Sequence, residues 1–353
     1  MKAHRYTEKT FAPFFDFAAR AVDTGRLPSA VVGVADREGV IGVRAYGRRP
    51  DGPRVAEEQE YALFSITKPV VGIAIAQLWE QGALSLDHEV KRYIPGFGAN
   101  RPDIVRIWHL LTHTSGMEEE PNKSLFLAGK ADPHLLETAI KSGCRFFAGT
   151  RKLYCSLAFA GLEEIVRVVT GQELEAYLQE HVFAPLGMKR TSFETYRSSP
   201  GRIMPVEKAE AYDIDFYLRA RHPAGGLFGS AGDLLRLGRV LLNGGRLEGV
   251  RILGPLTLEA MTTAQTEGIP ATRPDDFVDI EVGYGWFLPR GGHRIIAGSR
   301  PAGVYGHDGW AGCMFWMHPR EGVCFSFMTN LLDAAVHGAE PAAVHNVFAS
   351  CLG

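Results

Sequence analysis

Three short polar motifs contain the side chains of an activated serine nucleophile. They are Ser65-Ile66-Thr67-Lys68, Tyr154-Cys155-Ser156 and His307-Asp308-Gly309. A serine hydroxyl is a poor nucleophile until a neighbouring base takes its proton. An amine and a phenol can both manage that proton, so the three motifs predict acyl-transfer chemistry if the fold brings them into one cleft.

The first motif is expected at the start of a buried helix. Residues 66–81 are almost wholly apolar, Pro69 falls in the first turn, and Gly82 stands where a helix cap belongs. Residues three apart on a helix share a face, so Ser65 and Lys68 can touch. The helix N-terminus would also offer N–H donors to a developing oxyanion. The alternative is a serine that caps the helix while the lysine points to solvent.

The other two motifs are weaker when each is taken alone. A phenol near an ammonium is pushed toward phenolate, so Tyr154 could relay a proton, but a core tyrosine bonded to the backbone fits equally well. Glycines on both sides of His307 permit close approach of a ligand, and a Trp310 N–H on an edge strand could complete an oxyanion hole with the N–H of Ser65. The alternative is a glycine-rich turn with an exposed histidine.

Hydrophobic periodicity predicts an α+β fold. Strands are expected in a hairpin over 30–43 and again over 284–288, 314–317 and 323–328, the last two joined by a turn at 318–322. Helices are expected over 11–22, 66–81, 104–111, 157–169, 173–182, 233–242 and 341–350, whereas 198–221 has no clear period. The predicted architecture is an antiparallel sheet flanked by helices and built from both termini, with a mainly helical subdomain inserted.

We expect one catalytic domain over 1–353. Its α/β part is predicted to comprise 1–84 plus 220–353, its helical part 85–219, and its site would lie at the seam. Charged residues nearly balance, with 38 Lys and Arg against 40 Asp and Glu, for a net charge of −2. That balance argues against binding to nucleic acid or to an anionic membrane.

The chain starts without a signal peptide and has no run of about 18 apolar residues, so a cytoplasmic protein is expected. Five cysteines without a C-x-x-C pair argue against a disulfide framework or a zinc ribbon.

Taken together and in order, the motifs resemble the serine β-lactamase-like superfamily with its Ser-x-x-Lys motif. The resemblance is closest to the branch of class C β-lactamases and family VIII carboxylesterases, and it covers roughly residues 30–327. Besides the three motifs above, it rests on Leu110-Leu111-Thr112-His113-Thr114-Ser115-Gly116-Met117, Thr170-Gly171, Pro185-Leu186-Gly187-Met188, Pro223-Ala224-Gly225-Gly226-Leu227, Ser230-Ala231-Gly232-Asp233-Leu234 and Tyr284-Gly285-Trp286.

The resemblance implies a β-lactamase/transpeptidase-like fold and a set of roles. Ser65 would be the acylated nucleophile, Lys68 its base or electrostatic partner, and Tyr154 a second base and proton shuttle. The backbone N–H groups of Ser65 and Trp310 would form the oxyanion hole. Substrate would be bound by the remaining motif residues, which are Ser156, His307, Asp308 and Gly309. His109 and His113 are expected to be structural, and no metal or cofactor is expected.

Two departures from the class C pattern favour an ester substrate. The second motif ends in Ser156 where those β-lactamases have asparagine, and the third opens with His307 where they have lysine. A largely neutral histidine holds a substrate carboxylate less firmly than a lysine. The predicted function is therefore a cytoplasmic carboxylesterase acting on a small-molecule ester through an acyl-enzyme. The alternatives are a β-lactamase, a D-amino-acid amidase or peptidase, an acyltransferase and a non-catalytic member of the fold; the oligomeric state is left open.

Overall fold

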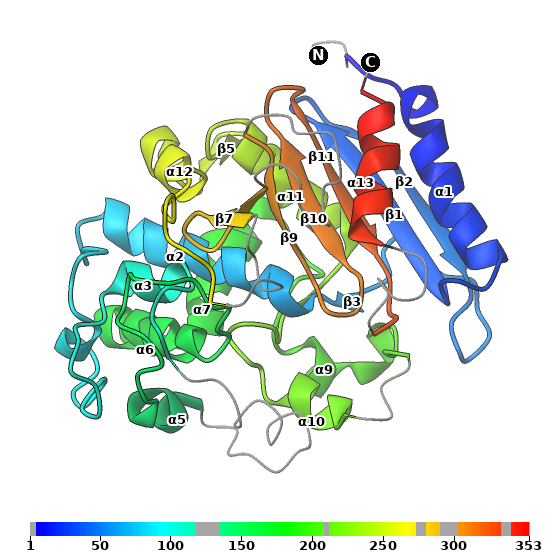
Figure 1. Ribbon diagram of the computed structural model, residues 1–353. Coiled ribbons are helices and arrows are strands. Elements are labelled where there is room, and N and C mark those ends of the chain that lie inside the picture. Colours follow the sequence, from blue (N-terminus) through cyan, green and yellow to red (C-terminus); the bar gives the residue numbers. More distant parts are fainter. Residues whose placement is uncertain are drawn as a thin grey trace.

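A seven-stranded antiparallel sheet forms the centre of the α/β part (Figure 1). The computed structural model describes residues 5–117, 135–207, 212–272, 280–289, 303–332 and 340–352. The strand order is β2-β1-β11-β10-β9-β8-β7, so strands from the first 50 residues lie beside strands from the last 75. A sheet built from both termini, as predicted, is confirmed.

The central strands are the ones that the sequence pattern predicted best. Strand β1 (Ser29–Asp36) is buried along its whole length and pairs on one side with β2 (Val40–Gly47). On its other side it pairs with β11 (Val323–Met328), which in turn pairs with β10 (Met314–His318). Apolar β-branched and aromatic residues fill these strands because both faces of the sheet are covered.

Helices cover both faces of the sheet. Helices α1 (Ala12–Asp23) and α13 (Pro341–Ser350) lie side by side on one face, at the right of Figure 1. The Phe14 ring of α1 lies 5.4 Å from Phe325 of the sheet and 5.2 Å from Phe348 of α13. Helix α11 (Ala231–Leu242) packs on the other face. Its N-cap Ser230 accepts the N–H of Asp233, which fixes where the helix begins.

The segment between the two halves of the sheet is mainly helical. Helix α2 (Thr67–Glu80) runs through its interior, buried on nearly all sides as its apolar sequence predicted. The surrounding helices are α3 (Ile107–Leu111), α5 (Leu135–Lys141), α6 (Ala158–Thr170), α7 (Leu174–Leu178), α8 (Ala184–Leu186), α9 (Thr195–Ser198), α10 (Ile214–Arg219) and α12 (Pro255–Met261). Val31 of the sheet, Ile75 of α2 and Leu162 of α6 belong to one buried cluster, so a single core crosses the proposed seam.

Shorter elements complete the chain. Two-stranded sheets pair β3 (Tyr61–Ala62) with β4 (Phe228–Gly229), and β5 (Arg246–Leu247) with β6 (Val250–Arg251). Single turns of 3-10 helix are η1 (Glu8–Phe11), η2 (Phe64–Ile66), η3 (Val90–Arg92) and η5 (Pro200–Arg202), and η4 (Gln179–Phe183) is a π-helix.

Two strand predictions were wrong. The predicted strand 284–288 is largely the turn between β7 (Ile280–Val282) and β8 (Phe287–Pro289). Gly285 has a φ of +84° and the Gly283 N–H donates to the Trp286 carbonyl at 2.8 Å, a conformation that no strand allows. Strand β9 (Tyr305–Asp308) lies between β10 and β8, so it is not an edge strand, and it ends before Trp310.

The helix predictions differ from the structure mainly at their ends. The helix expected over 104–111 begins only at Ile107, and the one expected over 173–182 changes to a π-helix after Leu178. The segment 198–221, which had no clear period, contains only the short η5 and α10, and residues 208–211 lie outside the described part. Helix α13 has the predicted bounds.

Candidate active site

Side chains from two distant segments meet on the hydroxyl of Ser65. The short η2 turn carries Ser65 into helix α2, where Lys68 is one turn further on. The Lys68 Nζ donates to Ser65 Oγ at 3.0 Å, and the Tyr154 hydroxyl donates to the same oxygen at 2.8 Å. Two donors on one hydroxyl oxygen favour the form of that oxygen that carries negative charge. The structure thus brings together the three residues that the motifs singled out.

Lys68 is enclosed by the protein. Its side chain is 1% exposed, and its Nζ also donates to the carbonyl of Ala224 at 2.9 Å. The same nitrogen lies 4.5 Å from the ring centroid of Tyr154 and 5.6 Å from that of Phe159. Hydrogen bonds and aromatic faces replace part of the hydration that burial removes from an ammonium. The lysine therefore does not point to solvent, which excludes the bland reading of the first motif.

Tyr154 is held in place by its neighbours in the chain. The N–H of Cys155 donates to Nδ1 of His113 at 3.1 Å, and the N–H of Leu153 donates to the His113 carbonyl at 2.9 Å. The His113 ring lies 4.4 Å from the Tyr154 ring. Two residues earlier, the buried Lys152 donates to the Ile280 carbonyl at 3.0 Å, which ties this segment to strand β7.

Neutral histidines surround the lysine. Burial, together with the positive charge of Lys68, lowers the pKa of His113 to about 3 and that of His222 to about 3. The same two causes, in the same order, hold the pKa of His307 well below its usual value. All three imidazoles are consequently uncharged at neutral pH. They add no second positive charge beside Lys68.

His307 lies behind the phenol of Tyr154. Its Nδ1 donates to the Asp308 carbonyl at 2.8 Å, so Nε2 is left as an acceptor. That Nε2 is buried and has no hydrogen-bond partner among the residues that the structure describes. The ring stacks on Phe287 at 3.9 Å, lies 6.3 Å from the Tyr154 ring, and is 1% exposed. The sequence left open an exposed histidine in a turn, and that alternative is wrong.

Asp308 lies on the opposite face of the sheet from His307. Successive side chains of a strand alternate between faces, and the Asp308 Oδ1 accepts the indole N–H of Trp316 at 2.7 Å. Trp316 in turn packs against His345 of α13. Burial raises the pKa of Asp308 to about 7. This geometry does not support the predicted substrate contact of the Asp308 carboxylate.

The loop after β9 approaches the nucleophile through its backbone. A Cβ on Gly309 would lie 2.3 Å from the carbonyl oxygen of Leu63, so only glycine fits there. The Gly309 N–H donates to the Cys313 carbonyl at 2.7 Å, and the ring of Trp310 lies 5.7 Å from that of Phe64. Ser156, which is half-buried, precedes α6, and its carbonyl accepts the N–H of Phe159 at 3.0 Å.

Several residues of the site were missed from the sequence. The motif Pro223–Leu227 was noticed without a role, yet its Ala224 carbonyl is a partner of Lys68. His222 accepts the Ala224 N–H at 2.9 Å and so shapes that turn. Phe64 was quoted only as a neighbour of the nucleophile. No signal in the sequence distinguishes a backbone carbonyl that binds a lysine from any other carbonyl.

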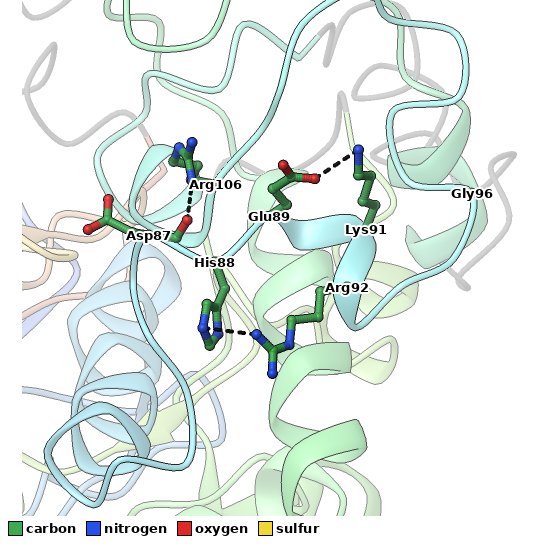
Figure 2. A pocket seen from close by; sticks show the side chains of 7 residues that line it. All are labelled: Asp87, His88, Glu89, Lys91, Arg92, Gly96 and Arg106. Atoms are coloured by element: carbon green, nitrogen blue, oxygen red, sulfur yellow. Dashed lines mark hydrogen bonds and ion pairs between the residues drawn. The ribbon is translucent and has the colours of Figure 1, made fainter.

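A separate surface pocket of about 620 Å³ contains no comparable chemistry. It is lined by Asp87, His88, Glu89, Lys91, Arg92, Gly96 and Arg106 (Figure 2). Its charges are paired with each other: Lys91 contacts Glu89 at 2.8 Å, and Arg92 contacts His88 at 3.1 Å. No lining residue has a hydroxyl or a thiol, so the candidate nucleophile remains Ser65.

Within the described ranges, no three His, Cys, Asp or Glu side chains are placed so that they could hold a metal ion. His109 and His113 each accept a backbone N–H, from Arg106 and Cys155 respectively. None of the helices in the described part of the chain is both long and apolar enough to cross a membrane.

Comparison with known proteins agrees with the fold and the motifs. The family model described as Beta-lactamase matches residues 14–347, so the chain belongs to this family. A putative D-alanyl-D-alanine carboxypeptidase of Escherichia coli (strain K12) is 25% identical, with 94% of this chain and 84% of that protein aligned. Esterase EstB of Burkholderia gladioli is 30% identical over 62% of this chain and 66% of its own length.

A solved structure shares the whole fold. The penicillin-binding protein homologue from Caulobacter crescentus is 21% identical, covers 100% of both chains and has a TM-score of 0.80. At that identity the likeness concerns the fold alone. Family and fold together support a serine hydrolase of the β-lactamase-like superfamily, and they do not decide between an esterase, a peptidase and a β-lactamase.

Proposed function

We propose that this protein is a carboxylesterase that cleaves small esters through an acyl-enzyme on Ser65. The observation that carries the proposal is the pair of hydrogen bonds on Ser65 Oγ, from Lys68 Nζ at 3.0 Å and from the Tyr154 hydroxyl at 2.8 Å. A hydroxyl placed between an amine and a phenol can lose its proton to one of them as it attacks.

The proposed reaction has two halves. Ser65 Oγ attacks the ester carbonyl, its proton passes to the Lys68–Tyr154 pair, and the tetrahedral oxyanion accepts the backbone N–H groups of Ser65 and Trp310. The C–O bond to the alcohol then breaks, and the alcohol leaves with that proton. Water adds to the acyl-enzyme in the same manner and releases the acid. Each oxyanion donor should contribute about 3 kcal/mol to the barrier reduction.

Three observations favour an ester over a lactam or a peptide. His307 is buried and neutral, so the third motif offers no positive charge to a substrate carboxylate. Ser156 stands where class C β-lactamases have an amide side chain that helps to hold the lactam substituent. The relative with the highest identity of those described above is an esterase. Lys68 already donates to Ser65 and Ala224, so it is not available to bind a distant carboxylate.

The peptidase alternative rests on the carboxypeptidase relative at 25% identity. A β-lactamase, an acyltransferase to a small alcohol and a non-catalytic member of the fold use the same site or none. A fluorophosphonate separates the last of these from the rest, because it adds its mass only to an activated serine.

The deciding experiment compares three substrates on the same preparation. The protein is assayed with p-nitrophenyl butyrate, a chromogenic cephalosporin and a peptide ending in D-Ala-D-Ala, each also with Ser65→Ala. The proposal expects the highest kcat/KM on the ester, a burst of p-nitrophenol, and loss of both in Ser65→Ala. A higher kcat/KM on the cephalosporin or the peptide would replace the esterase assignment and keep the mechanism. Ester turnover that survives Ser65→Ala would reject both.

A further inference from the structure

Phe64, the residue before the candidate nucleophile, has an unusual backbone conformation. Its φ is +45°, in the left-handed region that residues with a Cβ rarely adopt. Glycine would adopt this angle without strain. A bulky residue persists there only where the surrounding structure over-determines the conformation, and such positions cluster at functional sites.

Hydrogen bonds fix the backbone on both sides of Phe64. Its carbonyl accepts the Thr67 hydroxyl at 2.6 Å, and that hydroxyl accepts the Leu227 N–H at 3.1 Å. The preceding Leu63 donates its N–H to the Leu227 carbonyl at 2.9 Å and accepts the Ile66 N–H at 3.2 Å. The turn that carries Ser65 is thus tied to the segment that also provides Ala224, the partner of Lys68.

The ring of Phe64 joins this turn to two other parts of the site. It is 1% exposed, stacks on Tyr217 of α10 at 5.5 Å and 25°, and meets the edge of Trp310 at 5.7 Å and 80°. Trp310 is held from its other side by Tyr212 at 4.8 Å. Stacked and edge-to-face contacts of this kind fix the relative orientation of the rings.

Backbone geometry links the ring to the chemistry. The N–H of Ser65 belongs to the peptide plane between Phe64 and Ser65, so the dihedral angles of Phe64 set the direction of that N–H. The other expected oxyanion donor is the N–H of Trp310, the residue whose ring the Phe64 ring contacts. One aromatic side chain therefore orients one donor through its own backbone and contacts the residue that carries the second.

We propose that Phe64 is a positioning residue for the oxyanion hole, holding the Ser65 and Trp310 N–H groups at the separation that the tetrahedral intermediate needs. This inference rests on the proposed acyl-enzyme chemistry at Ser65, but not on the ester being the preferred substrate. Glycine at this position would keep the backbone angle and lose the ring, and the choice of phenylalanine assigns the function to the ring.

The test uses Phe64→Gly, which removes the ring and the strain, and Phe64→Leu, which keeps an apolar side chain without aromatic contacts. The matched control is Phe14→Leu, because Phe14 is 0% exposed in the core behind the sheet and touches no site residue. For each protein we would measure the melting temperature, kcat and KM on p-nitrophenyl butyrate, the inhibition constant of phenylboronic acid, and the rate of fluorophosphonate labelling. Boronates and fluorophosphonates form tetrahedral adducts on serine, so they report on the oxyanion hole for any acyl substrate.

We expect kcat of the Phe64 variants to fall by about 30-fold or more with KM within about threefold, because the lost interaction exists only in the transition state. Boronate inhibition and labelling should weaken by a similar factor. Phe14→Leu should lower the melting temperature and leave kcat unchanged.

A Phe64→Leu protein that is folded at the assay temperature and keeps kcat, boronate affinity and labelling within threefold of wild type would overturn the inference. If Phe64→Gly and Phe64→Leu both fail to fold, Tyr217→Leu removes the stacking partner instead and must show the same split between kcat and KM. A wild-type protein that is labelled but does not cleave esters would reject the esterase assignment only, because the boronate and labelling comparison would still decide the role of Phe64.

Discussion

The ammonium of Lys68 lies over the ring face of Tyr154, with 4.5 Å between Nζ and the ring centroid, while both side chains donate to the same hydroxyl of Ser65. The two groups therefore interact with each other as well as with the nucleophile. An ammonium on a ring face and next to a phenol oxygen favours the ionised phenol, which is the form that can accept the proton of Ser65. Lys68 and Tyr154 should consequently behave as one unit.

The unit makes a prediction about combined substitutions. Tyr154→Phe keeps the ring under Lys68 and removes the hydroxyl, and Lys68→Met keeps the length and removes the charge. Each should lower kcat/KM by about 10²–10⁴-fold, the usual contribution of a general acid or base. The double variant should lose little more than the worse single variant, because groups that act together are not additive. Steady-state kinetics of the four proteins measures this, and losses that multiply would mean that the two residues act independently.

His307 makes a prediction about substrate charge. A buried neutral imidazole offers no attraction to a carboxylate, so wild type should prefer p-nitrophenyl butyrate over the p-nitrophenyl monoester of succinic acid by about tenfold or more in kcat/KM. His307→Lys places a cation beside Tyr154 and should narrow or reverse that preference.

The control for this prediction is His307→Gln, which has no charge and should keep the preference even where the rate falls. The ratio of the two kcat/KM values is the readout, since it cancels any general loss of activity. An unchanged ratio in His307→Lys would show that another residue decides how substrate charge is sensed.

The elements that could be predicted from the sequence are those with a strong apolar pattern. Strands β1, β10 and β11 and helices α2 and α13 were found because burial of one or both faces is written into residues close together in the chain. The turn at Tyr284–Trp286 was mistaken for a strand because its aromatic residues suit a strand. They are buried by tertiary packing instead, as the Trp286 ring against Tyr305 illustrates.

The site could be predicted in part, for a related reason. Ser65 and Lys68 are close in sequence, so helical spacing was enough to join them, whereas Tyr154 was joined to them only through the resemblance. The sequence could not give the direction of the Asp308 carboxylate, because strand β9 was not recognised as an interior strand. Nor could it reveal the positive φ of Phe64, since phenylalanine is not a residue that signals that conformation.

Asp308 makes a prediction about stability at alkaline pH. Burial raises the pKa of its carboxyl from 3.8 to about 7, so the folded state holds the proton more tightly than the unfolded state. The stability that the protonated carboxyl provides is present below pH 3.8 and is lost as the pH rises toward about 7. Asp308→Asn cannot ionise and keeps an acceptor for the Trp316 indole, so it should gain on wild type as the pH rises.

Urea denaturation of wild type and Asp308→Asn between pH 4.5 and 8 measures this gain. The difference in unfolding free energy should grow by a few kcal/mol across that range, at about 1.4 kcal/mol for each unit of pKa difference. A constant offset at all pH values would mean that the carboxyl ionises equally well in the folded protein, and that only the hydrogen bond to Trp316 was altered.

His318 makes the opposite prediction, at acid pH. Its ring is 2% exposed between Phe325 and Phe348, both ring nitrogens lack a hydrogen-bond partner among the described residues, and burial lowers its pKa to about 4. The stability linked to a depressed histidine pKa is present above pH 6.5 and is lost as the pH falls toward 4. His318→Leu removes this titration, so the stability that wild type loses between pH 7.5 and 5 should shrink by about 2 kcal/mol in the variant.

The matched control is Phe348→Leu, which alters the same apolar cluster without altering a titratable group. It should lower the unfolding free energy by a similar amount at both pH values, because a cavity in apolar packing does not depend on protonation. The nearby His345, whose pKa burial also holds well below its usual value, keeps part of the acid sensitivity in His318→Leu. His318→Leu and wild type losing equal stability between pH 7.5 and 5 would contradict the prediction, and the charge would then be accommodated at this position by movement of α13 or by water.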